Sequence, residues 1–205
     1  MAVTTASVVV AATACSSGSS PTRADRVERA SSCAPVFDWD IARSWRLITL
    51  DDLVKVARGG TLKIRAKPYE PLTSAVSVTG GRNAPTDSEV LTALHARTGA
   101  ALAAPGTSTS GLARRADVTF REKAAEAVYF QGLRTVTATY RYRCTAKGAG
   151  PDRGTGRVTT WDQESVTFGL LDCLAPKREN PDSVPAGLAL GKRCPRDSPA
   201  ALSRP

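Results

Sequence analysis

The sequence predicts an α+β fold: two or three helices against an antiparallel sheet, with a three-stranded β region near the C-terminus and two disulfides. Three observations predict it. Residues 86–99 carry the caps and apolar spacing of a helix. Residues 135–144 alternate between two faces, as a strand does. Four cysteines between Cys33 and Cys194 are widely spaced, whereas metal and redox sites take short spacings.

The elements before the capped helix are predicted from alternation and spacing. Side chains alternate over 45–50, 62–66 and 72–78, which predicts three strands. Apolar residues recur at helical spacing over 50–57, with acidic residues in the first turn. Gly59-Gly60 would end that short helix.

The capped helix has a complete set of end signals. Thr86 and Glu89 form a capping box, in which each side chain satisfies a free backbone N–H of the first turn. Asp87 lies at the positive end of the helix dipole and His95 at the negative end. Gly99 supplies the stop.

A loop over 99–111 is expected to separate this helix from a second one. Thr119 and Glu122 repeat the spacing of a capping box. The alanine-rich residues that follow, 120–131, then predict a helix.

After residue 132, side chains of different character alternate with a period of two residues, as in strands. Three strands are predicted, 135–144, 156–161 and 165–173, and the last two are joined by the turn 162–164. In the last strand we expect Phe168 on the core face. A bulge at Gly169 would then bring Cys173 to the same face.

The composition excludes several kinds of chemistry. The 205 residues carry a net charge of +9 and one histidine, His95, which any Ser-His-Asp or Cys-His mechanism would have to use. Its place in the last turn of a helix explains it without chemistry. One imidazole cannot supply the usual zinc ligands, and Gly148 and Gly150 precede no helix that would complete a phosphate loop. We therefore expect no catalytic residue, metal or cofactor.

The acidic pairs have two interpretations. Asp38 and Asp40 would share one face of a strand, where paired carboxylates can serve hydrolysis or bind a hard cation. The same alternation would pack Phe37 and Trp39 inside and leave both acids in water, which is the interpretation we favour. The acids of the turn 162–164 are expected to serve local hydrogen bonds.

Residues 1–15, MAVTTASVVVAATAC, resemble a bacterial export signal that ends in a lipobox, with Cys15 as the lipid-modified residue. The apolar run 6–14 is shorter than the roughly 20 residues of a membrane span. Residues 16–32 are rich in serine and predict a flexible tether. The match departs from the usual pattern at Ala12, where a large aliphatic residue is common, and in having no Lys or Arg before the cysteine. Cleavage without lipid, and a plain N-terminal segment, are the alternatives.

Basic residues predict a possible contact surface. Lys63, Arg65 and Lys67 share one strand face, and Arg141 and Arg143 share another. Solvated faces are the simpler interpretation. If the two faces are contiguous, they would suit anionic lipid headgroups or envelope polymers. Nucleic acid is not expected as a partner, because an exported protein rarely meets it.

Three segments, 140–144 (YRYRC), 156–161 (GRVTTW) and 171–173 (LDC), together with the N-terminal signal, resemble uncharacterised lipoproteins of streptomycete-type actinobacteria. The likeness covers roughly the last third of the domain. It implies a location at the cell envelope and implies no activity. The family also carries Cys144 and Cys173 in the same relative places.

That resemblance favours the disulfide Cys144–Cys173, which leaves Cys33–Cys194 to tie the domain ends together. A simple meander would hold the first two cysteines about 9–10 Å apart, whereas bonded α-carbons lie within about 6.8 Å. The long connection 145–155 allows a different strand order. The alternative pairing is Cys33–Cys144 with Cys173–Cys194.

Together these features predict one domain over 33–205, with a loose tail from about residue 195. We expect a non-enzymatic binding module, lipid-anchored on the outer face of the cell membrane, or secreted if the lipid is absent. A secreted hydrolase that uses Asp38 and Asp40, and a secreted inhibitor, are the alternatives. Convergent acids in a deep pocket would favour the enzyme, and a flat basic or aromatic face would favour binding.

Overall fold

The computed structural model describes residues 34–112, 115–144 and 152–202, so the predicted signal and tether, with Cys15 and Cys33, lie outside the described residues. The strands are β1 (Val36–Leu50), β2 (Val54–Val56), β3 (Thr61–Arg65), β4 (Ala75–Thr79), β5 (Arg115–Thr119), β6 (Ala125–Cys144), β7 (Asp152–Trp161) and β8 (Thr167–Asp172). The helices are α1 (Asp87–Thr98), α2 (Val184–Arg193) and α3 (Pro199–Leu202), with single 3-10 turns η1 (Thr109–Leu112), η2 (Gln163–Ser165) and η3 (Lys177–Glu179). Helices beside a largely antiparallel sheet confirm the α+β prediction.

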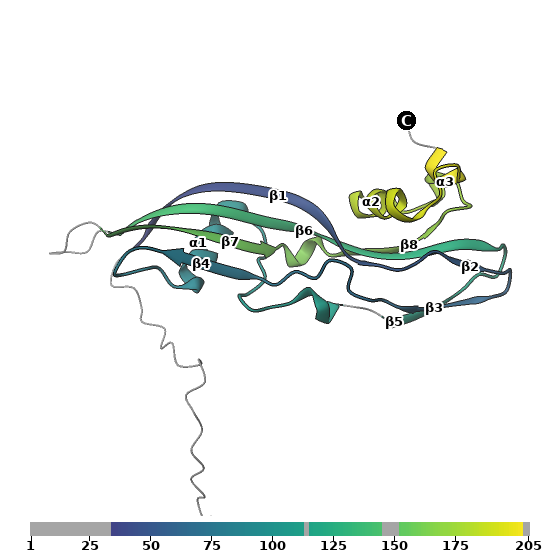
Figure 1. Ribbon diagram of the computed structural model, residues 1–205, viewed down its shortest axis with the longest axis horizontal. Coiled ribbons are helices and arrows are strands. Elements are labelled where there is room, and N and C mark those ends of the chain that lie inside the picture. Colours follow the sequence, from purple (N-terminus) through teal and green to yellow (C-terminus); the bar gives the residue numbers. More distant parts are fainter. Residues whose placement is uncertain (1–33, 113–114, 145–151, 203–205) are drawn as a thin grey trace, which may run out of the picture.

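Strand β6 runs along most of the length of the elongated molecule (Figure 1). At about 3.3 Å per residue, its 20 residues span roughly 65 Å. β1 and β2 pair along one edge of β6, and β7 and β8 pair along the other. β4 adds outside β7, and β3 and β5 form a separate two-stranded sheet. β6 therefore sets the position of the strands around it.

Strands β7 and β8 follow one another along the same edge, because both are antiparallel to β6. Trp161 at the end of β7 lies opposite Thr135, and Thr167 at the start of β8 lies opposite Gly132. The three predicted strands are therefore present but do not form a simple meander. The intervening residues, 162–166, protrude from one edge of the ladder and do not turn the chain back.

Hydrogen bonds hold this protrusion to β6. Asp162 accepts from the backbone N–H of Glu164 at 3.2 Å and begins η2. The guanidinium of Arg134 bonds the same carboxylate at 3.0 Å, and the Arg134 backbone N–H donates to Ser165 Oγ at 2.8 Å. Asp162 thus serves local hydrogen bonds, as expected for an acid of this turn.

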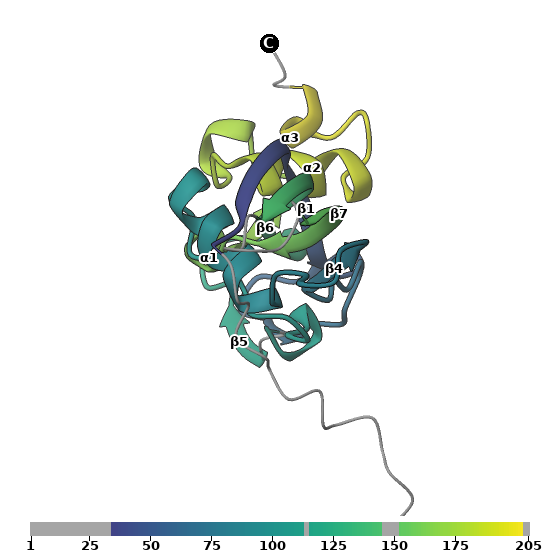
Figure 2. The ribbon, with the colours of Figure 1, turned by 90° about the vertical axis from the view of Figure 1, so that its left-hand side faces the viewer.

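Different elements cover the two halves of the sheet. At one end, Val90 and Leu94 of α1 pack on Val136 and its neighbours on β6. At the other end, α2 packs on one face over Phe130, and the β3–β5 sheet packs on the other. Viewed along the molecule, α2 and α3 lie on one side of the sheet and β5 on the other (Figure 2). The N-terminal half of β6 is therefore buried on both faces.

Two predicted helices are strands. Residues 50–57 give the end of β1 and then β2, whose three residues pair with Ala125–Ala127. Residues 120–131 lead into β6. Because β6 has no solvent face there, its small and apolar residues show no alternation of polarity, and the alanine-rich run imitates a helix. Strands do form at β3 and β4, and the predicted 45–50 strand is the end of a longer β1.

Helix α1 is confirmed with both of its caps. Thr86 Oγ1 accepts from the Glu89 backbone N–H at 3.2 Å, and the Thr86 N–H donates to Glu89 Oε2 at 2.8 Å. Gly99 ends the helix at φ 67°, in the left-handed region that favours glycine. The exposed His95 bonds the Ala100 carbonyl through Nδ1 at 2.7 Å, which gives it a structural contact.

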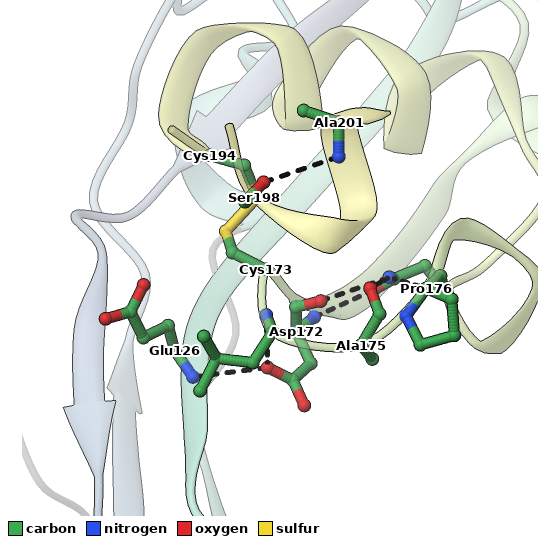
Figure 3. The surroundings of a disulfide bond; sticks show 10 residues. Glu126, Asp172, Cys173, Ala175, Pro176, Cys194, Ser198 and Ala201 are labelled. Carbon is green, nitrogen blue, oxygen red and sulfur yellow. Dashed lines mark hydrogen bonds between the residues drawn. A yellow bond between two sulfur atoms is a disulfide. The ribbon is translucent and has the colours of Figure 1, made fainter. Parts of the chain in front are cut away.

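The structure contains the disulfide Cys173–Cys194, with α-carbons 5.4 Å apart (Figure 3). The favoured pairings Cys144–Cys173 and Cys33–Cys194 are both wrong. Cys144 ends β6, whereas Cys173 follows Asp172, which lies opposite Ala127. Ala127 and Cys144 are 17 positions apart on β6, roughly 55 Å. Cys144 is buried and is not a free thiol, but Cys33 lies outside the described residues, so Cys33–Cys144 stays a prediction.

The register of β8 also differs from the prediction. Its pairing with β6 is regular, with no bulge at Gly169. Leu171 is buried and Phe168 is 48% exposed. The core face of β8 is therefore the face that carries Leu171, and Cys173, two residues further on, lies on the same side. The two alternating sets of side chains in β8 do not differ in polarity, so the sequence does not indicate which set faces the core.

The chain after β8 packs against the sheet. Ser183 caps α2, a helix not predicted from the sequence, by accepting from the Ala186 N–H. The part of the predicted loose tail up to Leu202 contains α3, and Ala200 is 1% exposed in the same core. Among the described residues, the helices lack the length and apolar character that crossing a bilayer requires.

Candidate anion-binding face

The C-terminal half of β6 presents alternate residues to opposite sides. Tyr140 and Tyr142 face α1 and are buried, because their rings join the core beneath that helix. Arg141 and Arg143 therefore point to the other side and are exposed. This outer face is the candidate site, and the sequence predicted both of these arginines.

Strand β7, which pairs with β6, adds two more arginines to the outer face. Arg153 lies directly opposite Arg143, and Arg157 lies opposite Thr139, so four arginines share the outer face. None of the four forms an ion pair with a carboxylate of the described residues. Like charges directly opposite one another destabilise a strand pair. The Arg143–Arg153 pair therefore lacks, within the described chain, the counter-charge that a bound anion would supply.

A hollow of about 650 Å³ lies at this end of the sheet. Its wall includes Arg141, Arg143 and Arg153, with Asp38 and Thr155 beside them. Asp38 is opposite Arg141 on β1 but forms no ion pair with it. The hollow is thus an open site with more positive than negative groups, suited to an anion.

A second hollow, of about 490 Å³, lies between β1 and α1. Phe37 and Trp39 line one side, and Ala93, Ala96 and Arg97 line the other. The two β1 rings stack at 5.1 Å between centroids, and Trp39 lies 5.0 Å from Tyr140. The two hollows share Phe37 and Asp38 at the start of β1, but the first opens on the outer face of the sheet and the second on the side of α1.

The other predicted basic residues lie elsewhere. Lys63 and Arg65 are on β3, and Lys67 follows it, in the part of the fold that packs on Tyr129. Tyr129 and Arg141 are roughly 40 Å apart along β6. The two basic faces are therefore separate and make no continuous patch.

Arg153 and Arg157 were missed, although the signal for Arg157 was present. It alternates with Val158 within the predicted strand 156–161. The predicted strand begins at residue 156, so Arg153 fell in the connection 145–155, whereas β7 begins at Asp152. Only the register shows that Arg153 meets Arg143.

The acidic pair lies as the favoured interpretation expected. Asp38 and Asp40 are exposed on the outer face, while Phe37 and Trp39 are half-buried on the core side. Neither acid is enclosed or set against a second carboxylate across a pocket. Among the residues that the structure describes, no three His, Cys, Asp or Glu side chains gather as a metal site.

Comparison with known proteins adds little to this geometry. No protein-family model matches the chain, and no curated protein matches it. A solved structure from Bacteroides vulgatus, titled "putative pore-forming toxin", is similar at 12% identity and a TM-score of 0.26. That match covers 68% of this chain, which spans 57% of the Bacteroides chain. So low a score carries no argument about fold or function.

Proposed function

We propose that this protein is a non-enzymatic binding module of the cell envelope, whose outer sheet face binds an anionic polymer. The observation that carries the proposal is the opposed pair Arg143–Arg153 at the wall of an open hollow. Arginine binds phosphate and carboxylate groups through paired N–H donors. Successive arginines on one strand face are about 7 Å apart, which suits a chain with repeated charges.

An anionic polymer fits this face better than an anionic membrane surface. Asp38 and Asp40 lie on the same face as the arginines, so a flat negative surface would meet both signs of charge. A narrow chain can follow Arg143 and Arg153, which lie opposite each other, and meets a carboxylate in the hollow only at Asp38, beside Arg141. The hydrolase alternative has less support, because both acids stand exposed on an open face.

The location is part of the proposal. The apolar run that ends at Cys15 and the serine-rich segment after it support a lipid anchor on the outer face of the membrane. Replacing Cys15 with Ser should abolish labelling by a fatty-acid analogue and release the protein from membranes. Unchanged membrane retention of this variant would contradict the anchor. Firm anchoring would imply more than one acyl chain, because a single chain binds weakly.

The binding proposal is tested with inorganic polyphosphate and with vesicles of anionic lipid as separate probes. The double variant Arg143→Gln/Arg153→Gln should lower affinity for polyphosphate at least tenfold, roughly the loss of one charge-assisted contact. Affinity of the unchanged protein should fall as salt is added. Stronger binding to vesicles than to polyphosphate would count against the polymer.

The fold offers a matched control. Arg65 and Arg115 are also directly opposite each other, on the β3–β5 sheet, and line neither hollow. Arg65→Gln/Arg115→Gln removes the same net charge from the far end of the molecule. It should leave polyphosphate affinity nearly unchanged. Equal losses in the two double variants would show that net charge alone drives binding and that the outer face is not the site.

A further inference from the structure

Strand β1 is an edge of the main sheet, and most of its outer side is free (Figure 1). β6 pairs with the inner side of β1 along its length. On the outer side, the described chain covers only the end of the strand, where the Tyr69 N–H donates to the Ile48 carbonyl at 2.8 Å. Over residues 36–47, the outer side forms no backbone hydrogen bond with the described chain. A free edge of roughly 40 Å therefore remains.

This edge lacks several features by which natural sheets prevent pairing with another chain. Protected edges are usually short, or are interrupted by a proline or a bulge. The opposite edge of the sheet, β4, has only 5 residues. The free part of β1 contains neither proline nor lysine, and its ladder with β6 is regular up to Leu47. A long, regular edge of this kind is a template for a further strand.

The charges along β1 suit a second copy of the same strand. Asp38 and Asp40 lie in its N-terminal half, and Arg43 and Arg46 follow towards its C-terminal end. All four are exposed, and none forms an ion pair with the described chain. Two copies that meet in antiparallel orientation place the acids of each beside the arginines of the other. Opposite charges across a strand pair stabilise it, whereas like charges destabilise it.

Backbone geometry limits the register of such a pair. Alternate residues of a strand direct their N–H and C=O groups to the same edge, so two copies related by a twofold axis pair even-numbered residues with even-numbered ones. Within residues 36–47, the two registers of greatest overlap are centred on Ile41 and on Ala42. Of these two, only the register centred on Ala42 sets Asp38 directly opposite Arg46. By symmetry, it does so twice.

The other nearby registers bring like charges together. A pair centred on Asp40 sets that acid opposite itself, and a pair centred on Arg43 does the same with the arginine. The register centred on Ala42 has no like charges directly opposite one another. It also sets the half-buried Trp39 opposite Trp45 of the second copy, and aromatic pairs across strands are stabilising.

We propose that the free edge of β1 joins two copies of this protein into a homodimer, with Ala42 at the twofold axis and Asp38 opposite Arg46 of the second copy. The two main sheets then form one sheet that is continuous through β1. Because directly opposite residues share a face, the two arginine faces lie on the same side of this sheet. The inference does not rest on the proposed function, since it needs only the free edge and its charges.

Sedimentation velocity of the full-length chain carrying Cys15→Ser tests the association without the proposed lipid. With β1 unchanged, a dimer is expected. Arg46→Asp makes both Asp38–Arg46 contacts repulsive and should raise the dissociation constant of the dimer at least tenfold. Asp38→Arg/Arg46→Asp exchanges the two charges and should restore the dimer. A protein that stays monomeric up to millimolar concentration, or a dimer that Arg46→Asp leaves intact, would overturn the proposal.

The strand offers a matched control for the restored dimer. Asp40→Arg/Arg46→Asp has the same residue types and the same net charge as the restoring variant. It still sets Asp38 opposite an acid of the second copy, so it should not restore the dimer. Restoration by this control in place of the other would show that the register centred on Ala42 is wrong. Thermal unfolding of each variant checks that its fold is intact.

Cross-linking tests the position of the twofold axis. Directly opposite α-carbons of antiparallel strands lie about 4.5–5.5 Å apart, which a disulfide can span. Ala42→Cys should therefore give a dimer linked through position 42 on oxidation, seen by electrophoresis without reductant. Ser44→Cys is the control, because the two copies of position 44 would be roughly 14 Å apart. Equal linking of the two variants, or none with Ala42→Cys, would contradict the proposed pairing.

Discussion

The ring of Tyr142 lies over Gly154, the residue directly opposite it on β7, and its hydroxyl donates to the Gly80 carbonyl at 2.6 Å. A Cβ atom on Gly154 would stand 2.5 Å from the ring and 2.6 Å from the Thr79 carbonyl oxygen. The tyrosine thus crosses β7 to reach the end of β4. Tyr140 repeats the arrangement over Gly156 and donates to the Ser77 carbonyl at 3.2 Å. These pairs tie β4, β6 and β7 together behind the arginine face.

Gly154→Ala should therefore destabilise the protein. The added methyl group would force the ring or the β4 backbone to move, and overpacking of this kind costs about 1–3 kcal/mol. Gly187→Ala is the control, because a Cβ there meets nothing within 4 Å. Gly187 lies inside α2, where alanine should stabilise by up to about 1 kcal/mol. Urea unfolding of both variants measures the two effects, and a Gly154→Ala variant as stable as the unchanged protein would contradict the packing argument.

The same tyrosines predict a loss of stability in alkali. Burial raises the pKa of Tyr142 above its ordinary value, and Asp152 adds to the effect. Burial also raises the pKa of Tyr140. A pKa that is higher in the folded state stabilises the fold fully below the unfolded pKa of about 10, and this contribution is lost as the pH rises through the folded value.

Tyr140→Phe/Tyr142→Phe should flatten this alkaline decline, although the lost hydroxyls lower stability at neutral pH. Tyr69→Phe serves as the control for removal of a phenol elsewhere. The measurement is the free energy of unfolding from about pH 8 to about pH 11. A decline as steep in the double variant as in the unchanged protein would assign it to other groups.

What could be predicted from the sequence was local. Helix α1 was identified with both ends, because Thr86, Glu89 and Gly99 act within a few residues of one another. The outer face of β6 was identified because one side of the strand meets water and the other meets the core. Polar and apolar side chains therefore alternate along it, with a period of two residues. Residues 125–131 were misassigned since neither side of that strand meets water.

The cysteine pairing and the complete site depend on long-range topology. A turn at 162–164 that reversed the chain would pair β8 with β7, whereas the observed chain continues along β6 and carries Cys173 to the far end of the sheet. Turn residues such as Asp162 suit either course. Arg153 joined the site only through the register that sets it opposite Arg143.

The continuation of β7 into β8 can be tested at Asp162. Its carboxylate is 7% exposed, bonds Arg134 at 3.0 Å and accepts from the Glu164 N–H. Asp162→Ala should lower the free energy of unfolding by about 1–3 kcal/mol, because it removes a cap and leaves donors unpaired. Glu164→Ala, an exposed change in the same turn, should cost less than about 0.5 kcal/mol. Equal effects in urea unfolding would contradict a structural role for Asp162.

The disulfide Cys173–Cys194 joins the end of β8 to the end of α2 across a sequence separation of 21. Its main effect is to restrict the unfolded chain, which for a loop of this length is worth about 3 kcal/mol. Cys173→Ala/Cys194→Ala should lower the stability by about that amount and loosen α2 from the core that includes Phe130 and Leu171.

Peptide mapping without reductant decides the connectivity directly. Trypsin can cut at Lys177 and Arg193, so Cys173 and Cys194 fall in different peptides that stay joined only through their sulfurs. A linked pair holding these two cysteines is expected, and it should separate on reduction. A second linked pair holding Cys33 and Cys144 is predicted, since these remain of the four domain cysteines. A peptide that joins Cys144 to Cys173 would contradict the strand order, because those residues lie at opposite ends of β6.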